Sequence, residues 1–158
     1  MLGDDSVKAS NRLQCVGPGG RRRPTEQRTL QTFDESLGRC SADEHFLDRF
    51  YDRFLASSPK VREKFATTDF ARQKRAVLGS LQLILQAARN PEDADRHLRD
   101  VAERHSSAQL AVGAELYDLW LDSLLATVRE IDPAFGPEVE EAWEDVMAVG
   151  IRYLVSRY

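Results

Sequence analysis

The segment FARQKRAVLGSLQLILQAARNP, residues 70–91, gives the strongest indication of fold class in this 158-residue chain. Its apolar side chains recur every three or four positions, which places them on one face of a helix. They are Phe70, Val77, Leu81, Ile84, Leu85 and Ala88. The Asn90-Pro91 pair then ends the pattern, because the residue before a proline is disfavoured in helical backbone. The stretch therefore predicts one long amphipathic helix.

Helical spacing continues on both sides of this stretch. On the N-terminal side, apolar residues recur from Leu30, and Phe46, Phe50 and Phe54 share one face of a helix that should end before Pro59. Further helical patterns cover residues 92–105, 112–131 and 139–154. Asp132-Pro133 and Gly136-Pro137 separate the last two, and no segment alternates like a half-buried strand. We therefore predict an all-α fold of six or seven helices.

The predicted start of the second helix rests on a capping motif. Ser41 precedes the phenylalanine face, and Glu44 follows Ser41 by three residues, which is the spacing of a capping box. We expect Ser41 to be the N-cap of the helix that carries Phe46, Phe50 and Phe54.

The first 27 residues differ in composition from the rest. Gly17–Pro24, GPGGRRRP, holds three glycines and two prolines after a polar stretch without periodicity. Such a segment buries too little apolar surface to offset the entropy lost on ordering. We predict a disordered tail at 1–27 and one folded domain at 28–158. Arg21–Arg23 are interpreted as a solvated part of the tail, and a basic arm for an anionic partner is the alternative.

Composition and motifs exclude several classes of function. The net charge of -4 argues against a nucleic-acid-binding domain. No apolar run approaches the roughly 20 residues that span a bilayer, and the N-terminus has no secretory pattern, so we expect a cytoplasmic protein that binds no membrane. Cys15 and Cys40 are expected to be reduced thiols. The chain contains no HExxH, no GxSxG and no glycine-rich phosphate loop ending in Lys-Ser or Lys-Thr.

Of the three histidines, only His105 is placed like a ligand. It follows Leu98 by seven residues and Val101 by four, so it shares their apolar face. An imidazole on that face needs a hydrogen bond or a metal ion. His97 lies among charged residues and His45 lies at a helix start, so both are interpreted as solvated.

These elements together resemble the globin family, and most closely the haem domain of bacterial flavohaemoglobins and related single-domain bacterial globins. In FYDRFLASSPKVREKF, Phe50–Phe65, the resemblance identifies Tyr51 as the distal tyrosine, Pro59 as the opening of the next short helix and Phe65 as the phenylalanine that stacks on haem. It then continues through the stretches at 73–77, 98–107, 117–131 and 139–150. The likeness covers about residues 30–158.

The resemblance implies a globin fold, with helices A, B, C, E, F, G and H around a haem b pocket. His105 is then the iron ligand, and Tyr51 and Gln73 are the distal residues that donate hydrogen bonds to a bound gas. The remaining pocket walls are Phe65, Val77, Leu98 and Val101.

The proximal side departs from the flavohaemoglobin pattern. Tyr117 matches the tyrosine that supports the proximal histidine, but it lies two residues farther from His105 than is usual. The place of the family's late glutamate falls on or near Tyr158, and no glutamate follows Glu144. The peroxidase-like electron donation of that glutamate is therefore not implied.

The expected function is reversible binding of O2, and of NO, CO or sulfide, at a histidine-ligated iron. The resemblance makes nitric oxide dioxygenase activity accessible, with an external reductase to return the iron to its ferrous state. A gas or redox sensor, or a haem-free helical module that binds other proteins, is the competing class. The sequence assigns no oligomeric state.

Overall fold

The computed structural model describes residues 24–105 and 114–156 of the chain. The helices are α2 (Pro24–Ser41), α3 (Phe46–Ser57), α4 (Pro59–Lys64), α5 (Phe70–Arg89), the 3-10 turn η1 (Pro91–Asp93), α6 (Ala94–His105), α7 (Ala114–Ile131) and α8 (Pro137–Ser156). These described residues include no strand. The all-α prediction is therefore confirmed.

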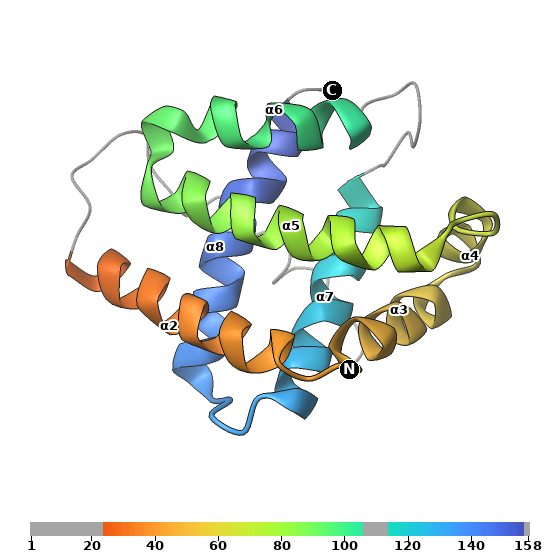
Figure 1. Ribbon diagram of the computed structural model, residues 1–158, viewed down its shortest axis with the longest axis horizontal. Helices are drawn as coiled ribbons and strands as arrows, with labels where there is room; N and C mark the ends of the chain where they lie inside the picture. The colour runs from red at the N-terminus through yellow and green to blue at the C-terminus, as the bar shows by residue number, and fades with distance from the viewer. Residues whose placement is uncertain (1–23, 106–113, 157–158) are drawn as a thin grey trace, which may run out of the picture.

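The helices pack in crossing pairs around one core. Figure 1 shows α5 and α6 lying along each other, with α7 and α8 crossing behind them. α2 packs against α8, and α3 packs against α7. Large side chains that are almost fully buried lie between these pairs: Trp143, Phe33, Phe46, Phe50, Leu81, Leu98, Leu124 and Met147. The rings of Phe33 and Trp143, 4.6 Å apart and edge to face, join α2 to α8.

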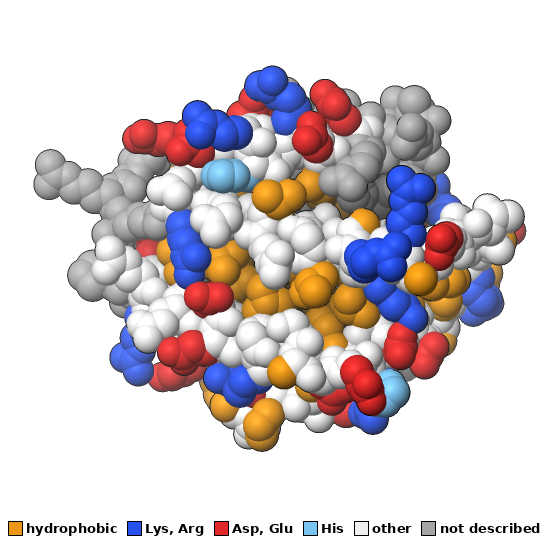
Figure 2. All heavy atoms as spheres, in the orientation of Figure 1, with side chains coloured by type: hydrophobic (Ala, Val, Ile, Leu, Met, Phe, Trp, Pro, Cys, Tyr) orange, Lys and Arg blue, Asp and Glu red, His pale blue; other side chains and the backbone are white. Residues whose placement is uncertain are grey.

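Apolar side chains also reach the surface on one face of the molecule (Figure 2). On the face drawn in Figure 2, apolar side chains gather over the middle of the molecule, while Lys, Arg, Asp and Glu lie around the rim. Acidic and basic side chains are interspersed along that rim. In the part of the chain that the structure describes, no helix is both long enough and apolar enough to cross a membrane.

Helix α2 begins earlier than the predicted domain boundary. It starts at Pro24, four residues before the boundary expected at 28. Proline suits the first position of a helix because its missing N–H has no partner there, and Glu26 in the first turn interacts favourably with the helix dipole. Cys15 and Arg21–Arg23 lie outside the described residues, as does most of the predicted tail.

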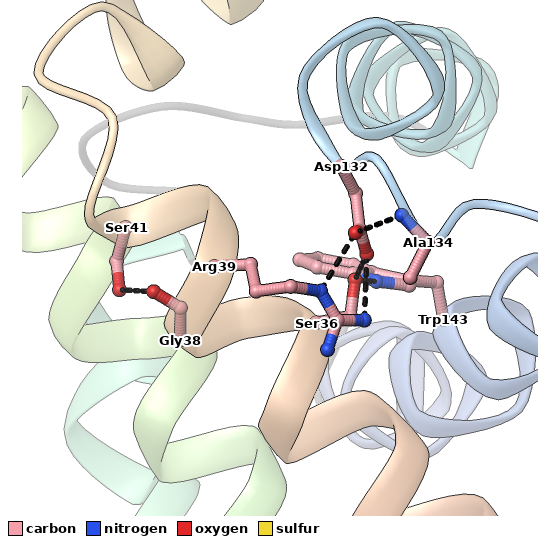
Figure 3. Close-up of polar contacts among 7 residues, drawn as sticks. All are labelled: Ser36, Gly38, Arg39, Ser41, Asp132, Ala134 and Trp143. Atoms are coloured by element: carbon pink, nitrogen blue, oxygen red, sulfur yellow. Dashed lines mark hydrogen bonds and ion pairs between the residues drawn. The ribbon is translucent and has the colours of Figure 1, made fainter.

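The predicted capping box at Ser41 is wrong. Ser41 is the last residue of α2, and its hydroxyl donates to the carbonyl of Gly38 at 3.2 Å, as Figure 3 shows. Helix α3 begins only at Phe46, and the Asp43 carboxylate accepts the backbone N–H of His45 at 2.8 Å. The apolar pattern of α2 runs through the buried Cys40, so the serine falls at the end of that helix.

The predicted break at Pro59 is confirmed. α3 ends at Ser57, and Pro59 opens the short helix α4. The hydroxyl of Ser58 accepts the backbone N–H of Lys60 at 3.2 Å, which caps α4. Helix α5 is capped in the same way, because the Asp69 carboxylate accepts the N–H of Arg72 at 3.3 Å.

A buried carboxylate joins α2 to the turn between α7 and α8. Asp132 accepts the Ser36 hydroxyl at 2.6 Å, Arg39 Nε at 2.7 Å and Arg39 Nη2 at 3.0 Å, together with the backbone N–H of Ala134 at 2.9 Å (Figure 3). The indole of Trp143 donates to the Ser36 oxygen at 2.8 Å. Burial opposes the charge of Asp132, but these hydrogen bonds outweigh it and lower the pKa of the carboxyl.

Gly150 sets how closely α8 approaches α5. A Cβ added at Gly150 would lie 2.7 Å from both Cδ1 and Cγ1 of Ile84, and 3.1 Å from its Cγ2. Ile84 is buried and branched at Cβ, so it has little freedom to move away. We expect Gly150→Ala to destabilise the protein by about 1–3 kcal/mol in urea unfolding.

Gly38 provides the matched control for this substitution. It lies in the exposed part of α2, and nothing is within 4 Å of an added Cβ. We expect Gly38→Ala to be neutral or to stabilise the protein by up to about 1 kcal/mol, because alanine is the better helix former. Equal effects of the two substitutions would contradict the close contact of α5 with α8.

Candidate functional site

Tyr51 lies at the centre of an aromatic cluster formed by α3, the end of α4 and the start of α5. Its ring centroid is 4.9 Å from Phe50, 5.3 Å from Phe70 and 6.1 Å from Phe65, in edge-to-face arrangements. Phe65 also packs on Phe54 at 5.7 Å. The Tyr51 side chain therefore lies in an apolar environment that is formed by rings on three neighbouring elements.

The Tyr51 hydroxyl is neutral and has Gln73 as a polar neighbour. The residue is only 3% exposed, and burial raises the pKa of its phenol above the ordinary value, an effect that the neighbouring Gln73 amide partly offsets. A neutral phenol keeps its O–H and can donate a hydrogen bond, and the amide of Gln73 can donate as well. The structure thus brings Tyr51 of α3 and Gln73 of α5 together.

The facing walls of α5 and α6 are aliphatic. Val77 is buried on α5, one turn after Gln73. Leu98 and Val101, on α6, are almost completely buried, and α6 packs along α5. α6 ends at His105, whose side chain lies outside the part of the chain that the structure describes. The residues four and seven positions before His105 are therefore both on the buried side of its helix.

The other sequence-predicted residues have different surroundings. Tyr117, in the first turn of α7, is buried. The side chain of His45 is exposed and lies 3.5 Å from Glu44 and from Asp48, and His97 is half-buried. In the described segments, no three or more His, Cys, Asp or Glu residues are grouped so that they could hold a metal ion. Cys40 is a free buried thiol, and burial raises its pKa to about 12.

Sequence reasoning missed two features of this region. Phe70 was assigned only to the apolar face of its helix, although it lies three residues before Gln73 and contacts Tyr51. Helical spacing could have placed it beside the distal residues. Lys74 and Asp48 form an ion pair between α5 and α3, and nothing in the sequence links two charges 26 positions apart.

These surroundings fit a flat apolar cofactor with an iron centre. Aromatic and aliphatic side chains supply walls on α3, α5 and α6, and the buried phenol of Tyr51 and the half-buried amide of Gln73 are neutral donors. A histidine at the end of the buried face of α6 is the residue type that ligates haem iron. The donor set and the walls are therefore suited to haem.

Comparison with known proteins gives three matches. A family model described as Globin matches residues 48–153. A flavohemoprotein from Rhizobium meliloti (strain 1021) is 28% identical over 100 residues, which is 61% of this chain and 24% of that protein. The chain thus spans about a quarter of the length of this relative.

A solved structure is similar over a larger share of the chain. It is the crystal structure of a Pseudomonas aeruginosa PAO1 protein described as structurally highly homologous to a human haemoglobin. The two chains are 43% identical, with a TM-score of 0.78 over 82% of this chain and 98% of the other.

Proposed function

This chain belongs to the globin family, and we propose that it binds haem b through His105 and a diatomic gas beside Tyr51 and Gln73. The observation that carries the proposal is the Tyr51 hydroxyl, buried within a cluster of aromatic rings with the Gln73 amide as a polar neighbour. Haem, when bound, would supply an iron that binds a diatomic gas, and His105 is the residue that would hold it.

The side chains around the site determine how the gas is held. Tyr51 and Gln73 can each donate a hydrogen bond to a ligand that carries partial negative charge. Phe65, Phe70 and Val77 keep water away and so strengthen these hydrogen bonds. We infer slow release of O2, which suits scavenging or sensing better than transport. The same site accepts NO, CO or sulfide.

The finer proposal is oxidation of nitric oxide to nitrate. One NO, one O2 and one electron give one nitrate, so each turnover needs an electron from an external reductase. The likeness to a flavohemoprotein supports this activity. NO consumption by the reduced protein in O2, measured with an electrode alongside nitrate, tests it. Rapid binding of NO without nitrate would favour the sensor instead.

Haem binding itself is tested by absorption spectroscopy. The purified protein is titrated with haemin, reduced with dithionite and then exposed to CO. We expect a Soret band that saturates at one haemin per chain, shifts on reduction and shifts again with CO. A spectrum identical to that of free haemin would favour the competing function, a haem-free helical module that binds other proteins.

Tyr51→Phe tests the role of the phenol. The variant keeps the ring contacts with Phe65 and Phe70 but loses the donor. A hydrogen bond to a charged group contributes about 1.5–3 kcal/mol, so we expect O2 dissociation to be about 10- to 100-fold faster in stopped-flow measurements.

The control for this substitution is Tyr153→Phe. The Tyr153 hydroxyl donates to Asp95 and joins α8 to the start of α6, away from the aromatic cluster. Its O2 dissociation rate should stay at the wild-type value. A wild-type O2 dissociation rate in Tyr51→Phe would show that the phenol does not stabilise the bound ligand.

A further inference from the structure

An ion pair joins α3 to α5 beside the proposed gas site. Lys74 Nζ donates to Asp48 Oδ1, and this hydrogen bond together with the lysine charge lowers the pKa of the Asp48 carboxyl. His45 Nδ1 lies 3.5 Å from the other carboxylate oxygen. Both members of the pair are partly exposed, so the pair lies at the edge of the site and not within it.

The ion pair is adjacent in sequence to both distal residues. Asp48 precedes Tyr51 by three residues, about one helical turn, and Lys74 directly follows Gln73. The Asp48–Lys74 ion pair therefore joins the same two helices that carry Tyr51 and Gln73. The ring contact of Tyr51 with Phe70 is a second link between these helices.

These side-chain links matter because the two helices are otherwise supported by different neighbours. α3 packs mainly against α7 and α4, whereas α5 packs mainly against α6 and α8. The separation of α3 and α5 near Tyr51 is therefore not set by a broad backbone interface between them. Protein hydrogen bonds span donor–acceptor distances of only about 2.7–3.2 Å, so a small shift of α5 would change whether Gln73 and Tyr51 can both reach the same ligand.

We propose that Asp48 and Lys74 are positioning residues that hold α5 against α3 at the separation at which Gln73 and Tyr51 act together on the bound gas. The inference rests on the proposed function of the site. It assigns a role in ligand release to two residues that do not themselves touch the ligand.

A similar ion pair elsewhere on α5 serves as a control that distinguishes a positioning role from a general contribution to stability. Arg89 Nη2 lies 2.8 Å from Asp34 Oδ2 and joins the far end of α5 to α2. The exposed fractions of its side chains, 38% and 52%, are close to the 32% and 47% of Lys74 and Asp48. Partly exposed pairs of this kind contribute little to stability, so both should be dispensable for folding.

The test compares Lys74→Met with Arg89→Met in the haem-loaded full chain. We expect Lys74→Met to speed O2 dissociation by roughly two- to tenfold, as a weakened hydrogen bond would. The C–O stretching band of the CO complex should shift or split in the same variant, because the distal donors are no longer held in one arrangement. Arg89→Met should leave both unchanged, and Lys74→Arg should restore the wild-type values in part.

Two further measurements test the role of the ion pair independently of Lys74→Met. Asp48→Asn removes the same ion pair from α3 and should reproduce the effect of Lys74→Met even if the lysine variant folds poorly. In 15N-labelled protein without haem, the side-chain amide resonances of Gln73 should move in Asp48→Asn, which changes the ion pair from the other helix, and not in Arg89→Met.

The outcomes distinguish this inference from the function on which it rests. A wild-type protein that does not bind haemin overturns the proposed function, and the Gln73 resonances then still report whether the ion pair positions the amide. A wild-type protein that binds haem and O2, with unchanged O2 release and CO band in both Lys74→Met and Asp48→Asn, overturns the positioning role.

Discussion

Replacing His105 with glycine is expected to abolish the specific haem absorption of this protein. His105 ends α6, whose buried residues Leu98 and Val101 lead to it on the same helical face. The imidazole is the one protein ligand proposed for the iron, and the walls alone would hold haem without fixing its orientation. The haemin titration should lose its sharp, saturable Soret band.

Added imidazole should restore that band. Glycine leaves space where the side chain stood, and a free imidazole can occupy it and supply the missing nitrogen. His97→Ala is the control, because His97 lies on the same helix and is only half-buried. A wild-type spectrum in His105→Gly would exclude His105 as the iron ligand. Loss of the Soret band in His97→Ala would instead indicate His97 as the ligand.

Replacing Asp132 with alanine is expected to cost about 3 kcal/mol of stability. The carboxylate accepts hydrogen bonds from Ser36, Arg39 and the backbone of Ala134, and its side chain is fully buried. Removing it leaves Ser36 and the Arg39 guanidinium without their acceptor, and losing one member of a buried charged network typically costs about 3–5 kcal/mol. Arg39 is partly exposed, so water can solvate its guanidinium once the carboxylate is removed. We therefore expect a loss of stability at the lower end of this range. Urea unfolding with a fixed m-value measures it.

Glu130→Gln is the control for the Asp132 substitution. Glu130 lies two residues earlier and binds Arg49 and Arg53, but all three side chains are exposed. Exposed ion pairs contribute about 0–1 kcal/mol. A loss as large as that of Asp132→Ala would show that the buried network has no special role in holding α2 against the turn between α7 and α8.

The Asp132 contribution should also depend on pH with a definite sign. The pKa of the folded carboxyl is lowered, because the hydrogen bonds it accepts outweigh the effect of burial. The unfolded chain therefore takes up a proton at higher pH than the folded one, and the stabilisation is complete above the unfolded pKa of about 3.9 and declines as pH falls towards the folded pKa. The stability difference between the wild type and Asp132→Ala should be constant near neutral pH and shrink below about pH 4.

Which segments are helical, and where most of them end, could be predicted from the sequence alone. Apolar spacing and proline positions are local properties, and they correctly predicted the break at Pro59 and the end of α5 before Pro91. The same local pattern carried the likeness to globins, which the family match over residues 48–153 confirms. Local patterns failed at Ser41, because a serine at a helix end and one at a helix start look alike when the extent of the preceding helix is unknown.

The tertiary structure alone decided which side chains meet. Ser36 and Asp132 are 96 positions apart, and Asp48 and Lys74 are 26 apart, so no periodicity relates them. The contact between Gly150 and Ile84 likewise depends on how α8 crosses α5. Helix formation follows from neighbours within one or two turns, whereas the crossing of two helices depends on the fit of all their side chains at once. The proposed roles of Asp48 and Lys74 therefore follow only from the tertiary contact between α3 and α5.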